Sequence, residues 1–157
     1  MTRASDIEGD VPQQAVEALR AGLGQSLIGV VLFGSRARGD HRPESDWDFL
    51  IIADGLPDHP FDRHKLLKRL LPADLRGEIS ILAKTPDEFE SHLPALYLDI
   101  ALDGQILHDP RGYAAYRVSV LQRIIERAGL YRELTPAGDI WHWRSPPHGS
   151  WSLEWGT

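Results

Sequence analysis

LIGVVLFGSRARGDHRPESDWDFLIIAD, residues 27–54, is the stretch that decides the fold. An apolar run ends at Gly34-Ser35, ten mainly polar residues follow, and Asp46-Trp47-Asp48 then opens a second apolar run. The pattern predicts a strand, a phosphate-binding turn and a second strand. Side chains alternate between the two faces of a strand, so Asp46 and Asp48 should point the same way, about 7 Å apart along the strand. Trp47 then belongs to the opposite, core-facing side.

The residue types in this stretch favour binding of a metal ion and a phosphate group. Two carboxylates at the spacing of Asp46 and Asp48 can share divalent cations, which prefer oxygen ligands. Gly34-Ser35 lies where a buried strand ends and a turn or helix begins, so backbone N–H groups there can hold a phosphate. Glycine allows the phosphate to approach closely, and the Ser35 hydroxyl is a further donor.

Basic residues gather around the same turn. Arg36 and Arg38 are placed either to neutralise phosphate oxygens or to be solvated turn residues. The chain as a whole has a net charge of −6, which argues against a polynucleotide as the main partner. A local positive patch in an acidic protein instead suits a small anion such as a nucleoside triphosphate.

A two-metal site, or a base for an attacking hydroxyl, needs a third carboxylate. Glu78 is the candidate, because it comes early in the third expected strand, near the point where Asp46 and Asp48 would lie if the strands were neighbours. The residues beside it on that strand are apolar. A carboxylate at the mouth of the strand, solvated or paired with an arginine, is the structural alternative. Asp74 is the substitute if Glu78 is not used.

Composition sets the class of protein. A chain of 157 residues favours one domain with a real hydrophobic core. It has no cysteine, which excludes disulfides, thiolate zinc sites and cysteine nucleophiles and fits a reducing cytosol. No apolar run approaches the roughly 20 residues that span a bilayer, and the N-terminus has no apolar signal core. We therefore expect a cytoplasmic protein without a membrane segment.

Strands and helices interleave along the chain, which predicts an α/β (α+β) fold with a small mixed sheet flanked by helices. We expect disorder at residues 1–9 and a first helix that Asp10 caps, with Pro12 in its first turn. The expected strands are 28–33, 46–53, 77–82 and 105–108. The expected helices are 61–71, a short one capped by Thr85, 92–103, and the longest at 111–128.

The C-terminal tail is rich in tryptophan. We expect a hairpin with Trp141 and Trp143 on one arm and Trp151, Leu153 and Trp155 on the other, joined by Pro-Pro-His-Gly. Cross-strand aromatic pairs stabilise hairpins, so the tail could be a lid packed on the core. The alternative is an exposed aromatic surface for a protein partner, a second copy in a homodimer, or a nucleobase.

The spacing Gly34-Ser35, ten residues, Asp46-x-Asp48, in the setting LFGSRARG…SDWDFLII, resembles the minimal nucleotidyltransferases of the DNA polymerase beta nucleotidyltransferase superfamily. The resemblance is strong over residues 27–54, continues to about Pro110, and covers nothing beyond. It implies a single domain with a core at about residues 10–110, and we treat the C-terminal helix and hairpin, residues 111–157, as an extension. It also implies ATP or another NTP with Mg²⁺ (or Mn²⁺), and transfer of a nucleoside monophosphate to a hydroxyl with release of pyrophosphate.

Matched residue by residue, the resemblance assigns triphosphate binding to Gly34 and Ser35 and metal binding to Asp46 and Asp48. Glu78 stands where the family more often has aspartate, and a longer side chain reaches differently. Glu78 is thus the expected third metal ligand or the base for the acceptor hydroxyl.

Three functions remain open from the sequence. The first is a metal-dependent nucleotidyltransferase that moves AMP from ATP to a hydroxyl of an unknown acceptor. The second follows from family members that act on HEPN-type toxins, some of them resembling protein-AMPylating antitoxins: an antitoxin-like or scaffold module that binds a protein partner, with or without AMPylation. The third is transfer to a small molecule such as an aminoglycoside, as in drug-modifying members of the family.

Overall fold

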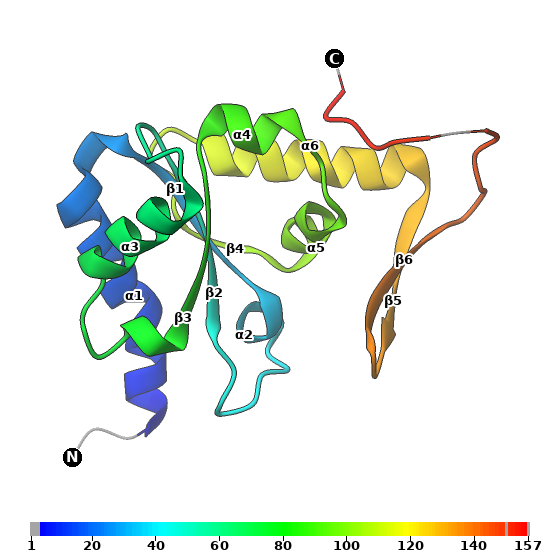
Figure 1. The fold of residues 1–157 in the computed structure, drawn as a ribbon. Coiled ribbons are helices and arrows are strands. Elements are labelled where there is room, and N and C mark those ends of the chain that lie inside the picture. Colours follow the sequence, from blue (N-terminus) through cyan, green and yellow to red (C-terminus); the bar gives the residue numbers. More distant parts are fainter. Residues whose placement is uncertain (1–3, 150, 157) are drawn as a thin grey trace.

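A four-stranded mixed sheet forms the centre of the fold. The computed structural model describes residues 4–149 and 151–156. The strands of the sheet are β1 (Leu27–Phe33), β2 (Trp47–Ala53), β3 (Ile79–Lys84) and β4 (Gln105–His108). They lie in the order β3-β2-β1-β4, with β1 antiparallel to β2 and β4, and β2 parallel to β3 (Figure 1). The expected small mixed sheet is confirmed.

Helices cover both faces of this sheet, which explains why β1 is apolar throughout. Helices α1 (Ala4–Leu23) and α3 (Pro60–Leu70) lie against one face, and α4 (Pro86–Ser91), α5 (Ala95–Asp103) and α6 (Tyr113–Ala128) lie on the other (Figure 1). Successive side chains of β1 after the irregularity at 27–29 accordingly alternate between two separate core clusters, Val30 and Leu32 in one and Val31 in the other. None of the helices in the described part of the chain combines the length and the apolar character that crossing a membrane requires.

The alternation along β2 sets the direction of the aspartates. Phe49 and Ile51 are fully buried in the cluster under α1 and α3, and Trp47 joins them at 8% exposure. Leu50 belongs to the cluster under α4, α5 and α6, so Asp48, two residues earlier, points toward that second side. The prediction that Trp47 is a core residue on the face opposite the aspartates is confirmed.

Several expected elements are found within a few residues of their predicted bounds, and two expectations about helices are wrong. Helix α1 begins at Ala4, so Asp10 is no N-cap and Pro12 lies inside the helix. A proline removes only one helical hydrogen bond, and the buried face that includes Val11 and Ala15 continues past it. Residues 1–3 of the segment expected to be disordered lie outside the described residues. At 20 residues, α1 is also longer than α6, which has 16.

The C-terminal hairpin exists, but its arms are not the expected ones. Strand β6 (Gly138–Trp143) carries the two expected tryptophans, and its partner is β5 (Leu130–Thr135), which precedes it. The turn is Pro136-Ala137, followed by Gly138 at φ +124°, a conformation that favours glycine. The hairpin forms through this short turn rather than through the longer Pro-Pro-His-Gly loop, because a short connection closes a hairpin with less loss of entropy. The described residues of the tail after Trp143 form no strand.

The tail instead returns across the helices and docks through Trp155. Its ring lies 5.1 Å from that of Phe89, and its indole Nε1 donates to the carbonyl oxygens of Phe89 (3.0 Å) and His92 (2.8 Å). These carbonyls lie at the end of α4, where helical partners run out. Trp151 remains 43% exposed. The tail is therefore a packed lid at Trp155 and an exposed aromatic surface at Trp151.

The free edge of β3 is covered by basic side chains of α3. Lys68 Nζ donates to the carbonyl of Ile79, and Arg63 Nη1 donates to the carbonyl of Ala83 at 3.1 Å. Arg63 is itself fixed by a bidentate ion pair with Glu88 at 2.6 and 2.8 Å. Backbone acceptors that would otherwise be open at this sheet edge are thereby satisfied.

We expect Trp155→Ala to lower the free energy of unfolding by about 2 kcal/mol, because it removes a half-buried aromatic side chain and the indole cap of α4. The control is Leu134→Ala, a residue at 66% exposure, for which an exposed side chain predicts a change within about 0.5 kcal/mol. Urea denaturation followed by circular dichroism measures both. Equal losses in the two variants would contradict the docked position of Trp155.

Candidate active site

The turn after β1 is built around a close contact between Gly34 and Asp48. Gly34 has φ +75° and opens helix α2 (Gly34–Arg38). A Cβ atom on Gly34 would lie 2.2 Å from Oδ2 of Asp48, which no real side chain allows. The strand register explains the contact, because Phe33, the last residue of β1, pairs with Asp48 near the start of β2. The structure thus brings the predicted phosphate-binding turn and one predicted metal ligand together.

The electrostatics of Asp48 favour a bound cation. Partial burial raises the pKa of the Asp48 carboxyl, repulsion from the Asp46 carboxylate raises it further, and the Arg38 guanidinium opposes both. The charge of Arg38 therefore only partly offsets the burial of Asp48 and its repulsion from Asp46. Oxygen ligands in this arrangement fit a divalent metal ion.

The third predicted carboxylate lies beside the start of β2, as expected, but one residue before β3 rather than within it. Strand β3 begins at Ile79 rather than Gly77, and Glu78 ends the 3-10 turn Arg76–Glu78 that precedes it. Because Ser80 pairs with Asp48, Glu78 lies opposite Asp46, just before β3 begins. The side chain of Glu78 is exposed. Within residues 4–149 and 151–156, no three His, Asp or Glu side chains gather closely enough to hold a metal ion. The role of Glu78 stays a prediction. Asp74 is exposed in the loop before this turn.

The two arginines of the turn have different surroundings. Arg36 is only 9% exposed; its guanidinium lies 4.5 Å from the Trp47 ring centroid. It donates to the backbone carbonyls of Pro43 (3.3 Å) and Ser45 (3.1 and 3.3 Å). These contacts fix the loop between α2 and β2, and so hold the segment that leads into the aspartates. Binding of a nucleotide by Arg36 stays a prediction.

Arg38 is the arginine that acts on the carboxylates. It lowers the pKa of Asp48, against the larger effects of burial and of Asp46. Its Nε donates to Asp40 at 3.2 Å, and its Nη1 lies 3.7 Å from Oδ2 of Asp103. Its side chain is 27% exposed. Arg38 therefore remains accessible from solvent beside the predicted metal ligands.

Sequence reasoning missed two residues that hold this turn. Asp103, the last residue of α5, contacts Arg38, and Gln105 at the start of β4 donates from Nε2 to the carbonyl of Ala37 at 3.0 Å. The sequence predicts Asp103 only as the end of a helix and Gln105 only as the start of a strand. Nothing local in the sequence indicates that they reach back to residues 37 and 38.

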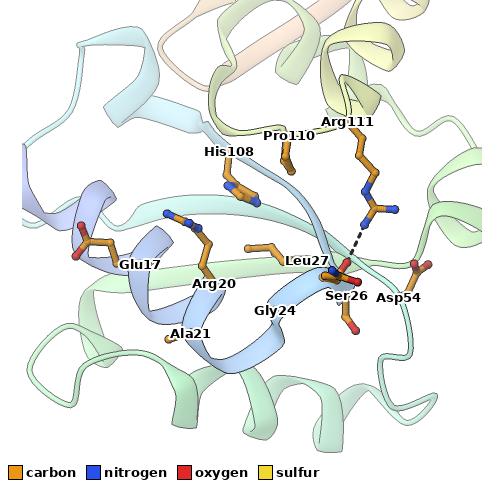
Figure 2. Close-up of a pocket in the computed structure, with 11 residues that line it drawn as sticks. Glu17, Arg20, Ala21, Gly24, Ser26, Leu27, Asp54, His108, Pro110 and Arg111 are labelled. Atoms are coloured by element: carbon orange, nitrogen blue, oxygen red, sulfur yellow. Dashed lines mark hydrogen bonds between the residues drawn. The ribbon is translucent and has the colours of Figure 1, made fainter.

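A large hollow lies at the other end of the sheet. It encloses about 1000 Å³ and lies next to Asp54, which directly follows the end of β2 opposite to Asp48. Figure 2 shows Arg20 and His108 on one side and Arg111 on the other, where Arg111 Nη2 donates to the carbonyl of Gln25 at 2.7 Å. This hollow has no paired carboxylates beside a glycine turn. We therefore place the candidate active site at Gly34, Asp46 and Asp48.

Comparison with known families identifies the class of protein. Residues 13–110 match the family described as the nucleotidyltransferase domain, which covers more than half of the chain and includes every predicted site residue. The chain therefore belongs to the nucleotidyltransferase domain family. Helix α6, the β5–β6 hairpin and the tail lie outside the match.

Two curated relatives are named as adenylyltransferases. The "Putative protein adenylyltransferase MJ1305" of Methanocaldococcus jannaschii is 48% identical over 48 residues, 31% of this chain and 33% of that protein. A spectinomycin 9-adenylyltransferase of Staphylococcus aureus is 39% identical over 69 residues, 41% of this chain and 26% of that protein. The alignments thus span between a quarter and a third of the length of these relatives.

Solved structures share the fold. A chain from a toxin–antitoxin crystal structure with AMP-PNP aligns with a TM-score of 0.53 and 20% identity, over 74% of this chain and 90% of that one. A chain from the complex of a tri-AMPylated Shewanella oneidensis HEPN toxin with an MNT antitoxin aligns with a TM-score of 0.53 and 16% identity, over 76% and 87%. At these identities the likeness concerns the fold alone.

We expect Gly34→Ala to destabilise the protein more than Gly39→Ala, by about 1–3 kcal/mol. Both glycines have positive φ, so both substitutions introduce backbone strain of about 1–2 kcal/mol. Only at Gly34 does the new methyl group also collide with Asp48, since nothing lies within 4 Å of a Cβ at Gly39. Urea denaturation measures the difference. Equal costs would contradict the close contact.

We expect Asp48→Asn to stabilise the metal-free protein at neutral pH. The pKa of Asp48 in the folded state is raised above its usual 3.8. The protonated carboxyl therefore stabilises the folded state, and this contribution to the free energy of unfolding is lost as the pH rises through the folded-state pKa. The stability difference between Asp48→Asn and wild type should therefore narrow as the pH falls toward 3.8. Denaturation in the presence of a chelator across this pH range measures it. A variant less stable than wild type at neutral pH would contradict the prediction.

Proposed function

We propose that the chain is a metal-dependent nucleotidyltransferase that transfers AMP from ATP to a hydroxyl group, with release of pyrophosphate. The observation that supports it is the Asp48 carboxylate packed against Gly34, with its pKa raised by burial and by the charge of Asp46, which is itself exposed just before β2. The relatives named as adenylyltransferases favour ATP as the donor.

Each site residue has a proposed role in this reaction. Asp46 and Asp48 would hold Mg²⁺ (or Mn²⁺), which when bound neutralises charge on the triphosphate and polarises the phosphoryl group. Backbone N–H groups at Gly34 and Ser35, with the Ser35 hydroxyl, would donate to phosphate oxygens. Arg38 would add positive charge from the solvent side.

The reaction itself exchanges one bond to the α-phosphorus for another. The acceptor oxygen forms a bond to that phosphorus, and the bond to the pyrophosphate oxygen breaks. The hydroxyl proton needs a base, and Glu78 would accept it or would serve as a third metal ligand. Positioning of the two oxygens and charge neutralisation supply most of the rate enhancement in such reactions.

The acceptor is either a protein hydroxyl or a small molecule, and one observation favours a protein. The β5–β6 hairpin exposes apolar side chains, with Leu134 at 66%, Ile140 at 49% and Tyr131 at 42% exposure. The strand register places Tyr131 and Ile140 on one face of the hairpin and Leu134 on the other, and exposed apolar groups of this kind are found at protein-binding surfaces. A second candidate function is therefore an antitoxin-like or scaffold module that binds a HEPN-type protein through this extension, with or without AMP transfer.

We expect Asp46→Ala/Asp48→Ala to reduce transfer of label from α-labelled ATP by about 100-fold or more, since loss of metal binding removes several kcal/mol of transition-state stabilisation. The assay contains Mg²⁺ and a lysate separated into protein and small-molecule fractions, so that the labelled fraction distinguishes the two acceptor classes. Asp54→Ala is the matched control, an exposed aspartate just past the other end of β2.

The same variants separate the two candidate functions. If the protein is a binding module without transfer activity, the Asp46→Ala/Asp48→Ala variant should bind the protein partner with wild-type affinity. Wild type should then transfer no label either. If ATP does not bind wild type in the presence of Mg²⁺, and the double substitution changes neither binding nor transfer, the proposed enzymatic function is wrong.

A further inference from the structure

Asp103 lies between two arginines from different parts of the chain. Arg132 of β5 makes a bidentate ion pair with it, from Nη1 to Oδ2 at 2.6 Å and from Nη2 to Oδ1 at 2.9 Å. Arg38 of α2 approaches the same Oδ2 at 3.7 Å, beyond hydrogen-bonding distance. One carboxylate therefore connects the hairpin, which lies outside the family match, with the turn beside Asp48.

The pair between Arg132 and Asp103 is the stronger of the two contacts. Both side chains are only 11% exposed, and both carboxylate oxygens are used in the geometry that suits a guanidinium best. Arg132 also lies 3.3 Å from Asp99 and 3.6 Å from Asp139. Asp99 in turn accepts a hydrogen bond from the indole Nε1 of Trp141 at 3.0 Å. The hairpin is thereby fixed to α5 through a set of polar contacts.

Arg38, in contrast, is held loosely. Its contacts are the 3.7 Å approach to Asp103 and a hydrogen bond to Asp40, whose side chain is 62% exposed. An exposed ion pair of this kind contributes little, so an incoming anion can replace it at low cost.

We propose that Arg132 is a positioning residue: by occupying both oxygens of Asp103, it keeps Arg38 available for the triphosphate of the donor nucleotide beside Asp48. Without Arg132, Asp103 would be a buried carboxylate with little compensating charge. Arg38, already 3.7 Å away, would move to pair with it and would leave the phosphate position. This inference rests on the proposed function, because it assigns Arg38 to the nucleotide.

The consequence is measurable without knowing the acceptor. We expect Arg132→Met to weaken equilibrium binding of MgATP by about fivefold at fixed ionic strength, the loss that one exposed ion pair can account for. In the Arg132→Met background, the further substitution Asp103→Asn should recover most of the loss, because a neutral amide no longer attracts Arg38. A purely structural role of Arg132 would make the double variant at least as weak as Arg132→Met.

Two further variants separate positioning from a general loss of positive charge. In an Arg38→Gln background, Arg132→Met should have no additional effect, whereas a long-range effect of charge would add to it. Arg132→Lys keeps the charge but cannot occupy both oxygens, so it should weaken binding by about twofold. It also tests the same step if Arg132→Met does not fold, as judged by circular dichroism. Arg144→Gln, an arginine that lies over Tyr131 on the hairpin, is the matched control and should bind as wild type.

The outcomes distinguish the inference from the function on which it rests. If wild type binds no MgATP, the proposed function fails. If wild type binds MgATP and folded Arg132→Met and Arg132→Lys bind equally well, or if the Asp103→Asn substitution recovers nothing, the positioning role of Arg132 is overturned while the proposed function stands.

Discussion

The close approach of the Asp48 carboxylate to Gly34 is the contact on which the rest of the site depends. It requires the antiparallel register of β1 and β2, which places Phe33 opposite Asp48, and it requires a residue without a Cβ. It also requires that the long loop between the two strands return to one position, which Arg36 achieves by binding the loop carbonyls from a buried site on Trp47. The packing of the core and the chemistry of the site are thus joined at one backbone position.

Arg36 and Arg38 show how one residue type serves two purposes within a single turn of helix. Residues two apart on a helix point in different directions, so one guanidinium is buried and structural while the other remains beside the carboxylates. The repulsion between Asp46 and Asp48 is only partly offset by Arg38. Negative charge that is only partly compensated in this way favours the binding of a cation, and perturbed carboxyl pKa values are common at functional sites.

Within residues 27–54 the sequence predicts the strands and the turn well, whereas it misses the contacts that reach this turn from later in the chain, for physical reasons. The structure of residues 27–54 can be predicted because strand alternation, glycine geometry and apolar runs are local properties of the sequence. Asp103 and Arg132 could not be found, because their pairing depends on a hairpin folding back onto α5. The tryptophan pattern predicts the wrong partner for the 138–143 arm, because it carries no information on the short Pro136-Ala137 turn, and Pro12 predicts a helix start although α1 begins at Ala4. Strand β3 begins two residues later than predicted, but Glu78 still lies opposite Asp46, and its role stays a prediction.

The solubility of the protein depends on the position of helix α3, because Arg63 and Lys68 of this helix cover the edge of β3. Arg63 and Lys68 satisfy carbonyls of β3 only while α3 lies in place. A local opening of α3, even with the sheet intact, would therefore uncover the carbonyls of Ile79 and Ala83, near the two ends of the strand, at once. Such a strand is a template for pairing with another polypeptide. Self-association of this protein should consequently follow the rate of α3 opening rather than the rate of global unfolding, and mild conditions that loosen one helix would suffice to start it.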